Sequence, residues 1–339
     1  MDIYNFAIIG CGRIAIQHAE SIKSVSGLNL VAVSDINKKR AQEFSKKYNV
    51  QYLTNEEIYE NKDINIVAIC TPNNTHPEIG IKLANAKKHI VCEKPLAISI
   101  KKADELIKKC KEKKVKLFAV KQVRFNPAVQ ALKKNIKNLG KIYSASLVIR
   151  WTRPQEYFDN DEWRGTKKLD GGTLINQGIH YLDVLLWCLG PIESIIAKKD
   201  TLAHKIEIED IALAVFKFRS GALGTLEFTI NTYPKNMECS LTVLGENGTV
   251  KIGGTAMNEV VHWDVKGVPR PEIESIQGNV YDKGLYQGSC PNHKLVYQNI
   301  INYMNGKEDI IADGEEARKS LELVEAIYRS ADHNKEIKL

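Results

Sequence analysis

The sequence has no apolar run close to the roughly 18 residues that a membrane-spanning helix needs. Its first residues enter a strand-like segment directly, without the basic and then apolar stretches of a signal peptide. The seven cysteines show neither CxxC spacing nor a Cys/His cluster, which argues against a disulfide framework and a structural zinc site. We therefore expect reduced, buried cysteines, no metal, no membrane contact and a cytoplasmic location.

Repeats, low-complexity segments and a strong charge bias are also absent. The chain has 339 residues, of which 43% are hydrophobic and 26% charged, enough for about two folded domains. Much of the net charge of +7 comes from lysines between Lys101 and Lys116, which surround apolar residues spaced as in a helix. No aromatic residues alternate with these lysines. We interpret the run as a solvated helix face and expect no nucleic-acid partner.

Residues 1–122 alternate short apolar runs with amphipathic segments. Strands are predicted at 5–10, 29–35, 64–71, 89–92 and 116–120, and helices at 12–24, 38–48, 76–86 and 99–113. Runs such as INIVAIC are apolar at nearly every position, as in a parallel sheet that helices cover on both faces. The alternation predicts an α/β fold with a doubly wound Rossmann domain over residues 1–122.

After residue 140 the apolar pattern changes to a period of two. Strands are predicted at 143–151, 223–230 and 260–265, with a hairpin turn at 245–248. The pattern predicts an α+β domain with a mostly antiparallel sheet over residues 123–314. An amphipathic helix is predicted at 315–333. We expect the segment 315–339 that contains it to pack back on the first domain.

The motif GCGRIA at residues 10–15 follows the first predicted strand and opens the first helix. In that context its glycine spacing is typical of a dinucleotide site. The first glycine permits a tight turn, the second lets the main chain approach a pyrophosphate, and the helix N-terminus supplies N–H donors. We assign Gly10, Cys11, Gly12, Arg13 and Ile14 to the cofactor site.

Asp35 is predicted to end the second strand, 20 residues after Ala15. A carboxylate at this place accepts hydrogen bonds from both hydroxyls of an adenosine ribose and repels a 2′-phosphate, which favours NAD over NADP. Three basic residues at 38–40 keep NADP as an alternative. The loop after the strand at 64–71 begins at the carboxyl end of a central strand, where ligands bind in such sheets. There we expect Thr71, Pro72, Asn73 and His76 to line the nicotinamide side.

Three motifs, in order along the chain, resemble those of a known family: GCGRIA at 10–15, CEKP at 92–95 and GGTLINQGIHYLD at 171–183. The chain resembles the glucose-fructose oxidoreductase, inositol dehydrogenase and MocA-like family. This resemblance implies a Rossmann domain followed by an open-faced α/β domain whose sheet supports homodimers or homotetramers. It also implies that Glu93 belongs to the cofactor site, that Pro95 follows a cis peptide, and that Lys94 contacts the reacting hydroxyl and the nicotinamide ribose. A lysine so placed donates to a developing alkoxide.

A well-marked helix is predicted at 174–189, with Thr173 as its cap and Gly190-Pro191 as its stop. Asn176 and His180, four residues apart, project from the same side of this helix. By the family resemblance both act on the substrate, and family members carry an aspartate where this chain has Asn176. We expect a neutral His180 to take the proton of a substrate hydroxyl while Asn176 positions the substrate.

Further segments, NQGIHYLD, WRGT at 163–166 and KQVRFNPAV at 121–129, resemble a subgroup that oxidises C3 of UDP-N-acetylglucosaminuronic acid for surface-polysaccharide biosynthesis. By this resemblance Gln122, Trp163 and Arg164 contact the cofactor. Arginine suits pyrophosphate and carboxylate groups because its guanidinium offers paired donors. The substrate-binding residues implied are Lys94, Arg124, Asn126, Asn176, Gln177, His180, Ser289, Asn292, His293 and Tyr297.

The function expected from these residues is NAD-dependent oxidation of a nucleotide-linked sugar at C3. The resemblance also implies that a keto acid reoxidises tightly bound NADH. Alternatives within the family are UDP-N-acetylglucosamine, another nucleotide-linked sugar, or a polyol such as inositol as the substrate. A non-catalytic NAD-binding regulator is an alternative of another class, and the joint presence of Lys94, Asn176 and His180 argues against it.

Overall fold

The computed structural model describes residues 3–281, 284 and 286–339, and the chain divides into two compact units. The first unit consists of Met1–Lys121 and Asn292–Arg318, and the second of Gln122–Pro291 and Lys319–Leu339. The boundary after Lys121 lies one residue from the predicted one. The later part of the chain differs from the prediction, because Asn292–Arg318 returns to the first unit and the tail, Lys319–Leu339, belongs to the second.

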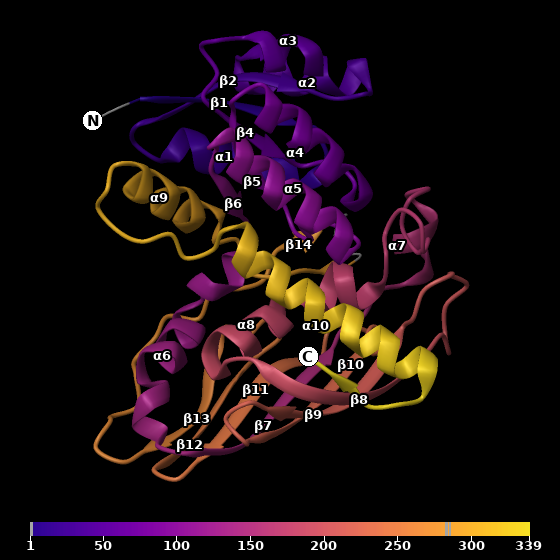
Figure 1. Ribbon diagram of the computed structural model, residues 1–339, viewed down its shortest axis with the longest axis vertical. Helices are drawn as coiled ribbons and strands as arrows, with labels where there is room; N and C mark the ends of the chain where they lie inside the picture. Colours follow the sequence, from indigo (N-terminus) through magenta and orange to yellow (C-terminus); the bar gives the residue numbers. More distant parts are fainter. Residues whose placement is uncertain (1–2, 282–283, 285) are drawn as a thin grey trace. The chain divides into compact units, whose positions relative to one another are not determined.

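The first unit is built on a six-stranded parallel sheet with the order β3-β2-β1-β4-β5-β6, the strand order of a Rossmann fold (Figure 1). Its strands are β1 (Tyr4–Ile9), β2 (Leu28–Ser34), β3 (Gln51–Tyr52), β4 (Ile66–Ile69), β5 (His89–Cys92) and β6 (Leu117–Ala119). All residues of β4 are buried, as a strand covered on both faces requires. The predicted doubly wound fold is confirmed. β3 was not predicted, since two residues carry no periodic signal.

Helices cover this sheet and include one from the later part of the chain. They are α1 (Arg13–Ser24), α2 (Lys38–Tyr48), α3 (Asn55–Glu60), α4 (His76–Asn85), α5 (Ile100–Lys113), the short η1 (Asn73–Thr75) and α9 (His293–Met304). α4 packs against α5, and α9 packs against α1. The Tyr297 ring of α9 meets the Phe6 ring of β1 edge-on, with centroids 5.5 Å apart. This packing explains why the chain re-enters the first unit after residue 291.

The second unit is built on an eight-stranded sheet with the order β13-β12-β11-β7-β10-β9-β8-β16 (Figure 1). Its strands are β7 (Ile142–Arg150), β8 (Ile192–Asp200), β9 (Ile211–Phe218), β10 (Leu223–Thr229), β11 (Glu238–Gly245), β12 (Gly248–Gly253), β13 (Glu259–Val265) and β16 (Ile337–Lys338). β7 and β10 run parallel and the other neighbours antiparallel, which confirms the predicted sheet type. β16 pairs with β8, and this pairing holds the tail in the second unit.

Among the described residues of this unit, helices pack on one face of the sheet, and apolar side chains on the other face are exposed. The unit contains η2 (Gln122–Phe125), α6 (Pro127–Asn135), η3 (Ile136–Leu139), α7 (Gln155–Asp159), η4 (Leu174–Gly178), α8 (Ile179–Leu189), most of α10 (Gly314–His333), and a two-stranded ribbon of β14 (Val280–Tyr281) and β15 (Tyr286–Gln287). α6 and α8 pack on each other and on the sheet. On the open face Leu213 and Val215 of β9 are 47% and 58% exposed, while Ala214 and Phe216 between and beside them are buried.

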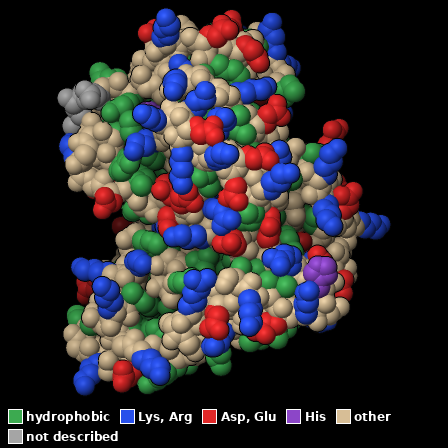
Figure 2. Space-filling view, viewed as in Figure 1, with side chains coloured by type: hydrophobic (Ala, Val, Ile, Leu, Met, Phe, Trp, Pro, Cys, Tyr) green, Lys and Arg blue, Asp and Glu red, His purple; other side chains and the backbone are tan. Residues whose placement is uncertain are grey.

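Helix α5 carries the lysine run noted in the sequence. It buries its apolar residues Ala103, Leu106, Ile107 and Cys110. Lys102 pairs with Glu105 at 2.8 Å and Lys109 with Glu112 at 2.7 Å. On the face of the molecule in Figure 2, basic and acidic side chains are interspersed. The run is therefore a solvated helix face, as predicted.

The seven cysteines are free and buried. Burial raises the pKa of the Cys11 and Cys110 thiols to about 12, so they are not thiolates at neutral pH. In the part of the chain that the structure describes, no helix has the length and apolarity to cross a membrane.

Candidate active site

A tight glycine turn joins β1 to α1. Gly10 has a φ of +97°, and a Cβ there would lie 2.6 Å from the main-chain oxygen of Cys70, which follows β4. Gly12 is the N-cap of α1, where no side chain caps the helix, and a Cβ added to it would meet no atom within 4 Å. Arg13 and Ile14 on the first turn are partly exposed. The helix therefore begins beside open space, with N–H donors suited to a pyrophosphate.

Asp35 follows β2 and is fixed beside this turn. Its two carboxylate oxygens accept the main-chain N–H groups of Cys11 at 2.8 Å and Asn37 at 2.7 Å. Each oxygen keeps a further lone pair for a ribose hydroxyl. The Arg40 guanidinium lies 3.6 Å from the carboxylate and offsets part of its charge.

The loop after β4 is tied to the loop after β5 by His76. The His76 ring is buried, with Nδ1 2.7 Å from the Pro95 carbonyl oxygen and Nε2 2.8 Å from that of Thr71. Burial lowers the pKa of His76, while the two carbonyl oxygens favour the doubly protonated ring. His76 was predicted at the cofactor, and its ring nitrogens instead contact main chain. Asn73 of η1 is buried and Pro72 exposed.

Glu93 and Lys94 follow β5, and the Lys94–Pro95 peptide is cis. Glu93 is 4% exposed, whereas Lys94 is partly exposed. Glu93 Oε2 accepts the Lys94 N–H at 3.0 Å, and Oε1 lies 2.9 Å from His18 Nε2 and 3.1 Å from His293 Nε2. Burial opposes ionisation, but the two histidine hydrogen bonds outweigh it and hold the pKa of Glu93 well below its ordinary value.

His293 and Tyr297 were predicted to line the substrate cleft, and the structure buries them in the first unit. Their exposed fractions are 1% and 0%. The Tyr297 hydroxyl lies 2.6 Å from His18 Nδ1, and the His18 and His293 rings meet edge-on at 5.1 Å. Helix α9, which the periodicity did not reveal, turns both residues toward Glu93.

These residues fit an NAD cofactor. Gly10 and Cys70 stand at the ends of β1 and β4, where the strand order reverses and dinucleotides bind. The turn at Gly12 suits the pyrophosphate and Asp35 suits the adenosine ribose. When bound, NAD supplies a nicotinamide that accepts a hydride. Lys94 is the partly exposed cation of the loop after β5, at the same edge of the sheet.

In the second unit, the helix predicted at 174–189 begins as a π-helical turn, η4, and continues as α8. Because η4 ends at Gly178, Asn176 and His180 lie on either side of the junction between the two helix types. Single π turns are rare and are frequently found at functional sites. Asn176 and His180 are 7% and 6% exposed. Thr173 stands at the predicted N-cap position, but its side chain makes no capping hydrogen bond, because its hydroxyl donates to the Glu209 main-chain oxygen at 2.6 Å.

Asp170, which the sequence motifs did not reveal, lies behind Asn176. Asn176 Nδ2 donates to Asp170 Oδ1 at 2.7 Å, and Asp170 Oδ2 accepts the Gly165 N–H at 3.0 Å. Asp170 is fully buried. Because the amide nitrogen faces Asp170, the carbonyl end of Asn176 points away from it. An acidic residue directly before two glycines was the signal in the sequence that could have found it.

Gln177 and Arg164 meet around Tyr157 of α7. Gln177 Nε2 donates to the Tyr157 hydroxyl at 3.0 Å. The Arg164 guanidinium lies 3.9 Å from the centre of the Tyr157 ring and 5.1 Å from that of Trp163. Asp161 pairs with Arg164 at 2.9 Å. The structure thus brings three predicted residues, Gln177, Trp163 and Arg164, into one cluster.

The start of η4 is held by residues far away in the sequence. Glu209 accepts the Leu174 N–H at 2.8 Å and the Tyr328 hydroxyl of α10 at 2.7 Å. Burial raises the pKa of Glu209. A Cβ on Gly172, whose φ is +149°, would lie 1.8 Å from the Tyr328 oxygen, so only glycine fits.

Arg124 and Asn126 were predicted to bind substrate, and both are buried in contacts within the second unit. Arg124 donates to Asp183 of α8 through Nε at 2.7 Å and Nη2 at 2.9 Å, with both side chains 2% exposed. Asn126 Nδ2 donates to the carbonyl oxygens of Ala256 at 2.8 Å and Met257 at 3.1 Å. The printed contacts of these two residues are therefore with α8 and with the chain at Ala256 and Met257.

The remaining predicted residues fall on both units. Gln122 Nε2 donates to the Ser289 hydroxyl at 3.0 Å within the second unit. Asn292 is the buried N-cap residue of α9 in the first. The segment from 289 to 297, read as one binding element, is therefore divided between the units.

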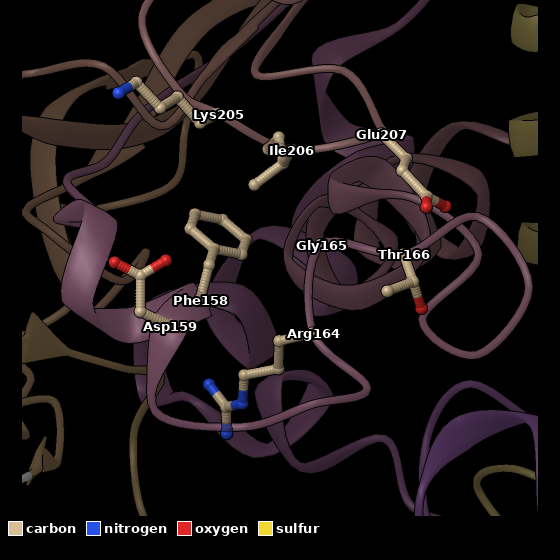
Figure 3. A pocket seen from close by; sticks show the side chains of 8 residues that line it. All are labelled: Phe158, Asp159, Arg164, Gly165, Thr166, Lys205, Ile206 and Glu207. Carbon is tan, nitrogen blue, oxygen red and sulfur yellow. The ribbon is translucent and has the colours of Figure 1, made fainter.

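A pocket in the second unit lies beside the cluster that Arg164 and Gln177 form around Tyr157. Figure 3 shows Phe158 and Ile206 facing one another across it. A Cβ on Gly165 would meet Ile206 at 2.8 Å and Phe158 at 3.1 Å, so glycine shapes its wall. Arg164 is the predicted site residue among its lining residues, which are Phe158, Asp159, Arg164, Gly165, Thr166, Lys205, Ile206 and Glu207.

Comparison with known proteins decides the family. Residues 4–121 match the NAD-binding Rossmann domain of the GFO/IDH/MocA oxidoreductase family, and residues 133–339 match its C-terminal α/β domain. The chain belongs to this family. It is an NAD-dependent oxidoreductase that acts on CH–OH groups.

Two similar solved structures are WlbA dehydrogenases in complex with NADH and UDP-GlcNAcA. The one from Bordetella pertussis is 36% identical, covers 100% of this chain and 99% of its own, and has a TM-score of 0.89. The one from Chromobacterium violaceum is 37% identical, covers 100% and 96%, and has a TM-score of 0.90. The myo-inositol 2-dehydrogenase of Thermotoga maritima is 27% identical over 98% of this chain and 97% of its own.

Proposed function

We propose that this oxidoreductase oxidises the C3 hydroxyl of UDP-N-acetylglucosaminuronic acid to the 3-keto sugar, a step in nucleotide-sugar synthesis for a surface polysaccharide such as an O-antigen. The observation that supports this substrate is the similarity of both units to WlbA dehydrogenases solved with NADH and UDP-GlcNAcA, at 36% and 37% identity over the whole chain. The myo-inositol 2-dehydrogenase has a lower sequence identity to this chain, 27%.

In this proposal, Lys94 and His180 divide the proton chemistry. The hydride leaves C3 for the nicotinamide of bound NAD. His180 takes the hydroxyl proton, and Lys94 donates to the oxygen while negative charge develops on it. Asn176 holds the substrate through the amide end that does not face Asp170. Arg164, stacked on Tyr157, serves the anionic groups of the cofactor.

The test is turnover of purified protein with NAD and each of three substrates: UDP-N-acetylglucosaminuronic acid, UDP-N-acetylglucosamine and myo-inositol. We expect NADH and a 3-keto product, identified by mass spectrometry, from the first. An α-keto acid is added in parallel, because we also propose that it reoxidises cofactor that stays bound. Oxidation of myo-inositol without oxidation of the nucleotide sugar would show that the substrate is a polyol.

Two variants separate an enzyme from an NAD-binding regulator. Lys94→Met and His180→Asn should each lower kcat by about 10²–10⁴-fold, the usual contribution of a general acid–base or oxyanion group. NADH binding, followed by fluorescence, should persist in His180→Asn. A regulator would keep its cellular function in both variants.

We further propose that the open face of the second sheet joins copies of the chain. Ile196, Leu213, Val215 and Leu223 on this face are 56%, 47%, 58% and 57% exposed. Ile196 and Val215 are direct cross-strand partners, so the apolar surface is continuous between β8 and β9. Contiguous apolar surface of this kind is typical of association sites.

A further inference from the structure

Four buried side chains, His18, Glu93, His293 and Tyr297, form a cluster next to Lys94 in the first unit. We propose that this cluster positions Lys94 for catalysis, with Glu93 holding the lysine main chain and the two histidines holding Glu93 in one orientation. The proposal rests on the catalytic role of Lys94 in the proposed function. It makes Glu93, His18 and His293 positioning residues.

Three separate parts of the first unit meet in the cluster. His18 comes from α1, the helix whose N-terminus fits the pyrophosphate. Glu93 comes from the loop after β5, and His293 is the first residue of α9. The Glu93 carboxylate is the common acceptor, with His18, His293 and the Lys94 N–H as its donors at 2.9, 3.1 and 3.0 Å.

The hydrogen bonds fix the protonation of both rings. Both histidines place Nε2 on the same oxygen of an ionised carboxylate, which only accepts, so each Nε2 carries a proton. His18 Nδ1 is then an acceptor, and the Tyr297 hydroxyl donates to it at 2.6 Å. Burial lowers the pKa of His18, which keeps its ring neutral. His293 Nδ1 is buried with no partner among the described residues.

Hydrogen bonds hold the main chain on both sides of Lys94. Glu93 Oε2 accepts the lysine N–H, and His76 contacts the carbonyl oxygen of Pro95 at 2.7 Å. The Lys94 side chain therefore leaves from a main chain with little freedom, as a catalytic group requires.

Several titratable groups share the surroundings of the Glu93 carboxylate. From α1 comes His18, from α9 His293 and Tyr297, from α4 His76, and from the strand ends the thiols of Cys70 and Cys92, together with Lys94. Burial raises the pKa of both thiols well above the ordinary value, so Glu93 is the anion of this group.

A metal ion is the competing occupant of the cluster. One ligand atom each of His18, Glu93 and His293 lie within 4.8 Å of one another. Hydrogen bonding already accounts for both nitrogens of His18 and for Nε2 of His293. We therefore argue for the hydrogen-bonded cluster and treat the metal as an outcome of the test.

The experiment compares kinetics of the full-length enzyme with UDP-N-acetylglucosaminuronic acid and NAD. Glu93→Gln should lower kcat about 10–100-fold, the usual cost of losing a supporting partner, with KM for NAD changed less than about threefold.

The two histidines give a matched pair of variants. His293→Gln should stay within about threefold of wild-type kcat, because the glutamine amide replaces Nε2–H and Nδ1 has no partner to lose among the described residues. His18→Gln should lose about tenfold or more, since a glutamine whose amide N–H replaces Nε2–H no longer has a ring nitrogen at the place where Nδ1 accepts from Tyr297. His89→Asn, at the other end of β5, is the control and should leave kinetics unchanged.

The outcomes separate the two proposals. No turnover of UDP-N-acetylglucosaminuronic acid by the wild-type enzyme would overturn the proposed function itself, and wild-type kcat in Lys94→Met would overturn the catalytic role of Lys94 on which the positioning role rests. A strongly reduced kcat in Lys94→Met together with wild-type kcat in Glu93→Gln would overturn the positioning role alone. About one equivalent of zinc per purified chain, with activity lost to a chelator, would replace the hydrogen-bonded cluster with a metal site. If Glu93→Gln does not fold, the His293→Gln and His18→Gln pair decides: wild-type kcat in both would reject the proposal.

Discussion

The glycine turn of the first unit and the η4–α8 segment of the second are built by different means. The turn uses main-chain groups of one short stretch, the end of β1 and the start of α1, with Asp35 beside it. Asn176 and His180 are instead placed by side chains from distant parts of the chain, among them Glu209 and Tyr328. A main-chain site therefore depends on glycine, whereas a side-chain site depends on buried polar pairs whose loss is costly.

The two glycines of the turn give the largest expected effect. Gly10→Ala forces a Cβ to 2.6 Å from the Cys70 oxygen at a positive φ, which should cost about 4–5 kcal/mol or more and leave little folded protein. Gly12→Ala meets no atom, so the free energy of unfolding should change by less than about 1 kcal/mol. Its affinity for NADH should fall, because the methyl group occupies the space of the pyrophosphate.

Chemical denaturation and NADH titration check this pair. A stable Gly10→Ala variant would show that the turn can relax. Wild-type NADH affinity in Gly12→Ala would show that the cofactor does not lie against this helix start.

In the second unit, the buried pair of Arg124 and Asp183 tests whether the loss of a buried polar pair is costly. Arg124→Met removes the guanidinium that pairs with the buried Asp183 carboxylate, which should lower the free energy of unfolding by about 3–5 kcal/mol. Arg150→Met is the matched control: Arg150 pairs with Glu227 at 2.6 Å and with Glu238 at 3.1 Å, but its side chain is 31% exposed, so the loss should stay near 1 kcal/mol or below for each pair, about the value of a surface pair. Equal losses in the two variants, measured by urea unfolding, would show that burial does not set the cost.

The buried cluster of the first unit predicts acid sensitivity. Burial holds the pKa of His18 below its ordinary 6.5, so the unfolded chain binds this proton more readily and stability falls as the pH drops below 6.5. The pKa of Glu93 lies well below 4.5, held there by the two histidines against burial, so its stabilisation is present above pH 4.5 and lost on further acidification.

Urea unfolding between pH 7 and pH 4 measures this dependence. Each histidine kept neutral in the fold contributes a slope of about 1.4 kcal/mol per pH unit below its ordinary pKa. His18→Gln should reduce the slope by up to that amount. An unchanged slope would mean that His18 is protonated in the native state.

The smallest effect on stability is expected on the open face of the second sheet. Val215→Lys places a charge at a side chain that is 58% exposed, so the free energy of unfolding of a single copy should change by no more than about 0.5 kcal/mol. Sedimentation should nevertheless show a smaller assembly, since the charge lies in the proposed contact between copies. An unchanged assembly would place that contact elsewhere.

Prediction from the sequence succeeded where the signal was local. The strands and helices of the Rossmann domain came from apolar periodicity, and β5 and α2 fall on the predicted residues. Helix α9 was missed, as was the role of His18, because both depend on a return of the chain to α1 after residue 291. Asp170 was missed for a similar reason. Its partner Asn176 lies in a π turn, and apolar periodicity does not predict such a turn.

The sequence by itself determined the glycine turn with its neighbouring Asp35, the two sheet types and the family, because each follows from short-range spacing that constrains the main chain. Only the tertiary structure decided that Arg124 pairs with Asp183, that the Thr173 hydroxyl bonds Glu209 and not its own helix, and that His293 and Tyr297 are buried with Glu93 next to Lys94. Those outcomes depend on which buried polar groups find partners across the fold, and such pairs are set by packing between distant segments.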